Sequence, residues 1–111
     1  MRTAWRAATF LLVASLASTA ASAEIKGDRE FGEYLSSQCT TCHQISGRTV
    51  GGVPSIVAWP EDQFIAVITS YKEGQRDNET MRTISHSLSL EEIAALAAYF
   101  GSLKLSGQAQ K

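Results

Sequence analysis

The sequence predicts an all-α fold, in which three to four short helices and long loops form one small domain. Apolar residues recur at helical spacing in three segments, around residues 29–42, 60–72 and 90–103. No run of alternating apolar and polar residues indicates a strand. The two intervening segments are polar or Gly-rich, and loops longer than about 12 residues are usually functional or disordered. Two such loops in a short chain indicate that the loops enclose a bound group.

The N-terminal residues have the order of a secretory signal. Arg2 and Arg6 precede an apolar run over residues 7–17, and small residues then lead to Ala23. The apolar run is shorter than the roughly 20 residues that a membrane-spanning helix requires. The sequence therefore predicts a cleaved signal peptide over residues 1–23 and one mature domain over residues 24–111. Export to the periplasm, with no stable membrane insertion, follows from this prediction.

The first helix is expected from Arg29 to Cys42. Phe31, Leu35 and Cys39 recur at four-residue spacing, which places them on one face. The Gly-rich segment that follows, residues 46–55, is expected to be an ordered loop.

The second helix is expected to begin at Pro60, a residue suited to the first helical position. A broad apolar stripe follows, formed by Phe64, Ile65, Val67, Ile68 and Tyr71. Lys72 lies in the expected last turn, and Gly74 is a natural terminator. The polar segment beyond it, residues 73–87, is expected to be a second long loop.

The third helix has the clearest start, because Ser89 followed by Glu92 forms the S-x-x-E pattern of a capping box. Its buried face is expected to carry Ile93, Leu96, Ala97 and Phe100, with the helix ending at Gly101 or Gly107. Its alanines would let another helix approach closely.

The chain's two cysteines, Cys39 and Cys42, allow several chemistries. A redox dithiol would belong to a βαβ unit, which the pattern lacks. A structural zinc needs about four ligands and no second ligand pair is present, whereas a disulfide would close a very short loop. C-x-x-C-H, completed here by His43, is the attachment motif of c-type haem. Helical spacing would place both thiols and the imidazole on one face, so one covalent haem c is the favoured cofactor.

Two residues compete for the far side of the iron. Met81 and His86 both fall in the second expected loop, before the third helix. Met81 is favoured because it follows a polar, turn-forming run (residues 76–80) that can carry the chain across the haem face. Ligation by His and Met is an electron-transfer arrangement, whereas an open site would permit ligand binding or a sensory role. Packing alone could explain Met81, and a surface loop could explain His86.

The mature chain resembles the class I c-type cytochromes. The residues that carry the resemblance are the C-x-x-C-H segment, the segment at residues 52–56, Met81, and the closing helix at residues 90–103. The runs SYKEGQRDNETM and LSLEEIAALAAYF are similar to those of small monohaem cytochromes related to the cytochrome subunit of flavocytochrome c sulfide dehydrogenase.

The resemblance implies a role for each matching residue. Cys39 and Cys42 would bind haem covalently, with His43 as proximal ligand and Met81 as distal ligand. The carbonyl of Pro54 would accept a hydrogen bond from His43, which fixes the ring's orientation. Trp59, Tyr71 and Arg76 would contact the haem or its propionates, although core packing explains Trp59 and Tyr71 equally well. The first helix would cross the last one, with Phe31 and Leu35 meeting Leu96, Tyr99 and Phe100.

The expected function is one-electron transfer in the periplasm, as a carrier or as the non-catalytic haem subunit of a dehydrogenase such as a sulfide dehydrogenase. The partner would be a redox protein, either a flavoprotein dehydrogenase or a terminal oxidase. The whole chain has a formal net charge of −1, and loss of Arg2 and Arg6 makes the remainder more acidic. With no cluster of Lys and Arg, nucleic acid is not an expected partner. The absence of a lysine ring favours apolar docking or a basic patch on the partner.

Overall fold

The computed structural model describes residue 18 and residues 25–105, and the predicted signal peptide and its cleavage site lie outside the described residues apart from residue 18. Five helices follow in chain order: α1 Arg29–Leu35, α2 Ser37–Thr40, α3 Glu61–Lys72, α4 Glu79–Ser87 and α5 Leu90–Ser102. Within the described residues the only β-structure is an isolated bridge between Val50 and Val53. The predicted all-α class is confirmed.

The first predicted helix is broken into α1 and α2 at Ser36. The Ser36 hydroxyl donates to the Glu33 carbonyl at 2.7 Å, and the Ser36 N–H donates to the same carbonyl at 3.2 Å. This local pairing tightens the last turn of α1 and competes with continued helix. The prediction of one helix to Cys42 was therefore wrong, although helical hydrogen bonding resumes after the break.

The segment expected to be a second long loop contains α4, which is the main correction to the sequence prediction. Asn78 begins this helix, since its side-chain oxygen accepts from the Met81 N–H at 2.9 Å. Met81, Ile84, Ser85 and Leu88 then follow at helical spacing. The signal was present in the sequence, but the many polar residues around it concealed the pattern.

The other two predicted helices are confirmed, with small shifts at their ends. Pro60 is the N-cap of α3 rather than its first residue, and Gly74 follows the end of that helix with φ of +74°. Both hydrogen bonds of the capping box between Ser89 and Glu92 are present at the start of α5. Gly101 lies inside α5, which ends one residue later.

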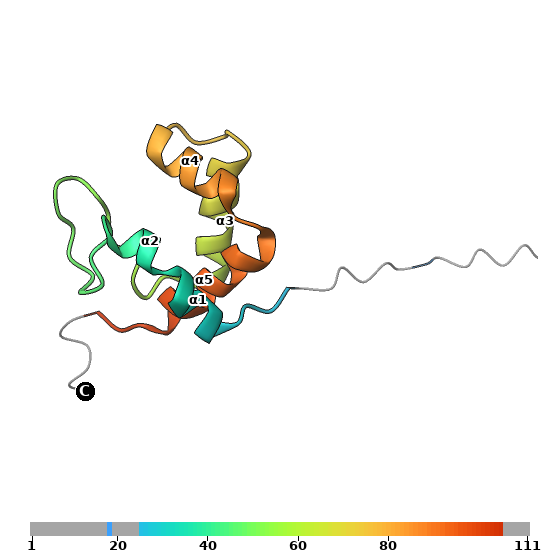
Figure 1. Cartoon of the computed structure of the whole chain (residues 1–111), viewed down its shortest axis with the longest axis horizontal. Coiled ribbons are helices and arrows are strands. Elements are labelled where there is room, and N and C mark those ends of the chain that lie inside the picture. The colour runs from blue at the N-terminus through green and yellow to red at the C-terminus, as the bar shows by residue number, and fades with distance from the viewer. Residues whose placement is uncertain (1–17, 19–24, 106–111) are drawn as a thin grey trace, which may run out of the picture.

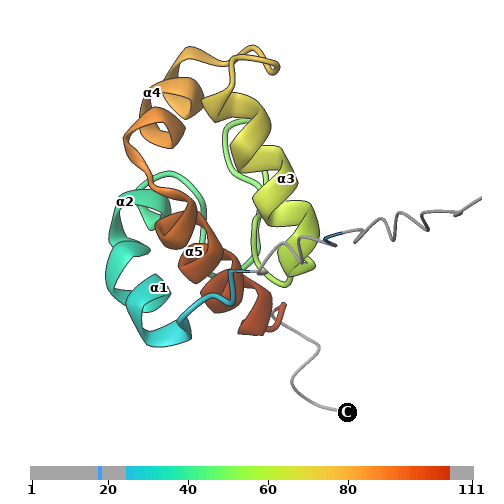
Figure 2. The ribbon, with the colours of Figure 1, turned by 90° about the vertical axis from the view of Figure 1, so that its right-hand side faces the viewer.

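The core is centred on α5, which packs against α1 on one side and α3 on the other (Figure 1). Every α5 residue from Ile93 to Phe100 is buried. The rings of Phe64 and Phe100 lie 5.8 Å apart at their centroids and join α3 to α5. The view in Figure 2 shows α3 and α4 forming the end of the molecule that lies away from α1.

Two glycines that the sequence analysis did not single out set the closeness of α1 and α5. A Cβ atom on Gly32 would lie 1.9 Å from the Ala95 carbonyl oxygen, and one on Gly27 would lie 2.0 Å from that of Ala94. Only glycine lets the two backbones approach this closely. The alanines of α5 contribute as expected, but glycine on α1 completes the contact.

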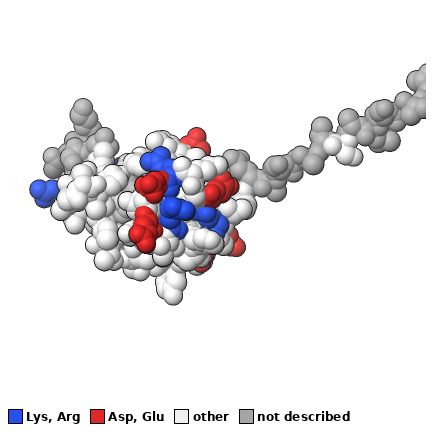
Figure 3. Space-filling view, turned by 90° about the horizontal axis from the view of Figure 1, so that it is seen from above, with Lys and Arg blue, Asp and Glu red and all other residues white. Residues whose placement is uncertain are grey.

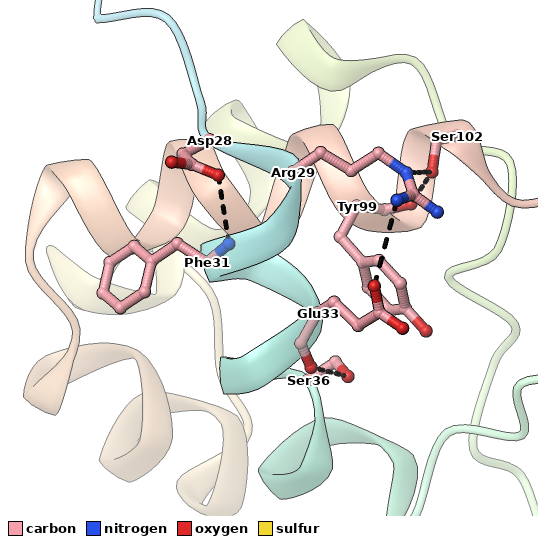
Figure 4. Close-up of polar contacts among 7 residues, drawn as sticks. All are labelled: Asp28, Arg29, Phe31, Glu33, Ser36, Tyr99 and Ser102. Atoms are coloured by element: carbon pink, nitrogen blue, oxygen red, sulfur yellow. Dashed lines mark hydrogen bonds and ion pairs between the residues drawn. The ribbon is translucent and has the colours of Figure 1, made fainter.

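Polar contacts also join α1 to the C-terminal end of α5 (Figure 4). The Arg29 side chain donates to the Ser102 hydroxyl at 2.9 Å and lies 5.8 Å from the centre of the Tyr99 ring. Leu35 packs against the core, whereas Phe31 is half-buried and lies on the other side of α1 from Tyr99. Only part of the expected apolar contact between α1 and α5 is therefore present.

Candidate haem site

A cavity of about 360 Å³ lies between α2, α3, α4 and the loop before α3. Its walls are mainly apolar, with side chains that include Ile56, Trp59, Phe64, Val67, Ile68, Ile84, Leu88 and Leu96. Large apolar pockets with a few polar groups are typical of ligand and cofactor sites. A flat apolar cofactor therefore suits this cavity.

The C-x-x-C-H segment forms one side of the cavity. The His43 N–H donates to the Cys39 carbonyl at 2.9 Å, so that the segment is a helical turn even though α2 ends at Thr40. Cys39, Cys42 and His43 all line the cavity. The structure therefore brings together the three residues that the motif predicted to share a face.

The orientation of His43 is set by the loop that faces it. His43 is only 9% exposed, and its Nδ1 lies 2.7 Å from the Pro54 carbonyl oxygen. A carbonyl can only accept, so Nδ1 carries the proton in this contact and Nε2 keeps its lone pair. A histidine fixed in this way is prepared to bind a metal through Nε2. The predicted hydrogen bond is therefore present.

Burial raises the pKa of the Cys39 thiol to about 11. A redox-active or metal-binding cysteine needs the opposite shift, because the thiolate is the reactive form. In addition, no group of three or more His, Cys, Asp or Glu residues in the described part of the chain is placed to hold a metal ion. The dithiol and zinc alternatives have no support from this geometry.

The two candidates for the far side of the iron lie in different places. Met81, in the first turn of α4, is half-buried, lines the cavity and packs against the core. His86 is exposed and lines a separate surface hollow with Glu79, Arg82 and Thr83. Because α4 is a helix, the five-residue separation turns His86 away from Met81. Only Met81 is brought to the same cavity as His43.

The polar lining is concentrated in a few residues. Trp59, Tyr71 and Arg76 all line the cavity, as the resemblance implied. Arg76 is the only Lys, Arg, Asp or Glu among the described lining residues, and its guanidinium lies 5.1 Å from the centre of the Tyr71 ring. This is the arrangement of a cation held over an aromatic face. The sequence analysis did not identify Gln38, Asn78 and Thr80, which also line the cavity.

These features define a class of protein, namely a small helical domain built around a c-type haem. Residues 26–104 match the Cytochrome c family, and the chain belongs to that family. The cofactor of this family is covalent haem c, and the residues of this chain match its attachment motif. The chain spans about two thirds and one third of the length of the two curated relatives that it matches.

Two relatives are named after dehydrogenases, one as a cytochrome subunit and the other as an electron acceptor. The chain is 34% identical over 72 residues to a "Cytochrome subunit of sulfide dehydrogenase" of Chlorobaculum tepidum, covering 65% of this chain and 66% of the relative. It is 31% identical over 72 residues to a "Thiosulfate dehydrogenase electron acceptor" of Thiomonas intermedia, covering 63% of this chain and 33% of the relative. The predicted resemblance to a sulfide dehydrogenase cytochrome subunit is confirmed.

A solved structure with the same fold is the cytochrome c4 of Acidithiobacillus ferrooxidans. The TM-score is 0.65 at 23% identity, and the match covers 74% of this chain and 53% of the other. The likeness extends the sequence resemblance to the arrangement of the helices, and the class I cytochrome c fold is confirmed. No helix in the described part of the chain is long and apolar enough to cross a membrane.

Proposed function

We propose that this protein carries single electrons in the periplasm, and that His43 and Met81 would be the two protein ligands of its haem iron. The observation that carries the proposal is that these two residues, from different elements, line one apolar cavity. His43 and Met81 would hold the haem iron between them, and a haem held by histidine and methionine would supply outer-sphere electron transfer at a raised potential.

The cysteines supply the covalent attachment in this proposal. Cys39 and Cys42 lie one helical turn apart beside His43, so that two thioethers and the proximal ligand come from one short segment. When bound, the haem supplies a one-electron iron couple. The chain's own contribution is to exclude water, to fix both ligands and to leave one edge accessible. Cys42 is exposed whereas Cys39 is half-buried, which places the accessible edge of this proposal on the Cys42 side.

Two further residues refine the site. Pro54 holds the proximal ring through its carbonyl, as described above. Arg76 is placed to pair with a haem carboxylate, because it is the one permanent charge among the described lining residues. Its position over Tyr71 places the guanidinium at the cavity, and no carboxylate in the described part of the chain forms an ion pair with it.

The proposed compartment rests on the signal-like order of residues 1–23 and on the chemistry of attachment, since c-type haem is attached outside the cytoplasm. The proposed partner is a dehydrogenase that oxidises an inorganic sulfur compound, for which this protein is the haem subunit or electron acceptor. The names of the two relatives support this choice. On the face shown in Figure 3, acidic and basic side chains lie beside one another rather than gathering by sign. Such a surface suits apolar docking better than steering by one sign of charge.

Replacement of Met81 tests the ligation. The oxidised holoprotein should show the weak long-wavelength absorption of a methionine–iron bond, and the reduced form should bind carbon monoxide slowly or not at all. Met81→Ala should abolish that absorption and allow rapid carbon monoxide binding. The matched control is His86→Ala, which removes the competing ligand from the same helix and should leave both properties unchanged.

The results also decide the alternative function. Rapid carbon monoxide binding by the unmodified protein would show an open-site haem protein and refute the carrier proposal. The partner is tested separately, by following reduction of the oxidised protein with sulfide or thiosulfate in a periplasmic extract of the source cells. Absence of reduction with either compound would remove the sulfur dehydrogenase assignment without affecting the ligation.

A further inference from the structure

The helix that carries Met81 has little packing of its own. Of the other described helices, α4 packs only against α3. Both ribbon views place it at the end of the molecule opposite α1 (Figures 1 and 2). Within α4 only Ser85 is buried, whereas Met81 and Ile84 are half-buried and the remaining residues are exposed. Segments with few buried contacts open at lower free energy than the rest of a protein, so the position of Met81 depends on whatever holds α4 in place.

One side chain from another helix holds the end of α4. Lys72, the last residue of α3, donates from Nζ to the Leu88 carbonyl at 2.6 Å and to the His86 carbonyl at 3.1 Å. These carbonyls lie at the C-terminal end of α4, where the helix dipole favours a positive charge. Among the described residues, no other side chain outside α4 and its caps hydrogen-bonds to this helix.

Two other carbonyls at this end are satisfied locally. The Ser87 hydroxyl donates to the Ile84 carbonyl at 2.7 Å, and the Leu88 N–H donates to the Ser85 carbonyl at 3.2 Å. Lys72 therefore adds hydrogen bonds to the apolar packing that joins α4 to the rest of the fold. No carboxylate among the described residues lies within ion-pair distance of Lys72, so its charge is directed at the helix end.

We propose that Lys72 is a positioning residue that holds α4 closed and thereby keeps Met81 on the iron. This inference rests on the proposed ligation by Met81. Met81 lies in the first turn of α4, and Lys72 binds the last turn of the same helix. The thioether sulfur of Met81 is uncharged, so its bond to the iron receives no support from charge attraction. Hydrogen bonds from a charged donor are stronger than those between neutral groups. Loss of the Lys72 contacts should therefore raise the fraction of time for which α4 is open.

The test is the rate at which imidazole replaces methionine on the iron of the oxidised holoprotein. At saturating imidazole this rate is limited by the movement of Met81 away from the iron, so it measures how often α4 opens. Lys72→Met keeps the apolar stem and removes the donor, and we expect the limiting rate to rise roughly tenfold, in line with the loss of hydrogen bonds from a charged group. Lys72→Arg should restore much of the original rate because it can still donate. Lys104→Met is the matched control for loss of one positive charge, since Lys104 is exposed and lies after α5.

A purely structural role would give a different result. Lys72→Met would then lower the denaturation midpoint while leaving the limiting imidazole rate as it is in the unmodified protein, and that outcome would overturn the proposal. If Lys72→Met fails to fold with haem, Lys72→Leu replaces it, because leucine also lacks a donor, and a rate equal to that of the unmodified protein would overturn the proposal equally. Failure of the proposed function is distinguishable, because the unmodified protein would then lack the methionine–iron absorption before any variant is made.

Discussion

The contact between Gly32 and Ala95 predicts that Gly32→Ala destabilises the protein, although helix propensity alone would predict stabilisation. Gly32 lies inside α1, where replacement of glycine by alanine would ordinarily stabilise a helix by about 0.5–1 kcal/mol. Here the new Cβ atom would lie 1.9 Å from the Ala95 carbonyl oxygen and 2.9 Å from the Tyr99 Cβ. Because unbonded heavy atoms lie about 3.5 Å apart, α1 would have to move from α5 by roughly 1.5 Å.

The expected cost of Gly32→Ala follows from that displacement. Overpacking a core costs about 1–3 kcal/mol, and a clash with backbone belongs at the upper end because no rotamer change relieves it. After the propensity gain is subtracted, the net loss is about 2 kcal/mol, which corresponds to a fall in Tm of roughly 10 °C for a domain of this size. The measurement is thermal and denaturant unfolding of the oxidised holoprotein, followed by far-UV circular dichroism and Soret absorbance.

Tyr34→Ala provides the control for Gly32→Ala in the same helix, since Tyr34 is 79% exposed. It should change the free energy of unfolding by less than about 0.5 kcal/mol. A Gly32→Ala variant with an unchanged or higher Tm would refute the reasoning, because it would mean that the two helices do not approach as closely as described.

Two other predictions concern the buried Ser85 hydroxyl and the two cysteines of the attachment motif. The Ser85 hydroxyl is fully buried with no hydrogen-bond partner in the structure, so Ser85→Ala should stabilise the holoprotein by about 1 kcal/mol; a lower denaturation midpoint would show that the hydroxyl has a partner. The Cys39→Ala/Cys42→Ala variant cannot attach haem and should lose most of its helicity by far-UV circular dichroism, because the helices surround the cofactor cavity. Native helicity in that variant would show that the chain folds without its cofactor.

The sequence was sufficient for those features that depend on neighbours in the chain. Ser89 and Glu92 define the start of α5 through contacts three residues apart, and Pro60 and Gly74 bracket α3. Cys39, Cys42 and His43 lie within one helical turn, so their shared face followed from spacing alone. The break at Ser36 is also local, but a serine hydroxyl that turns back on its own helix has no distinctive pattern in the sequence.

The sequence was insufficient for contacts between segments distant in the chain. Nothing near Gly32 indicates that Ala95 will lie against it, and nothing near Lys72 indicates that its ammonium will reach the carbonyls of His86 and Leu88. The choice between Met81 and His86 as the second iron ligand also depends on contacts between distant segments. Both residues were candidates by position in the chain, and the direction in which α4 faces the cavity separated them.

The sequence by itself therefore determined the helical class, the haem attachment segment and the start of α5, because each depends on residues within one or two turns. The tertiary structure alone decided which of Met81 and His86 lines the cavity with His43, how closely α1 meets α5 and which carbonyls of α4 the Lys72 ammonium reaches. These are distances between groups that the chain brings together only on folding. The physical reason is that local hydrogen bonding is encoded in short spacings, whereas packing geometry depends on the simultaneous fit of the whole core.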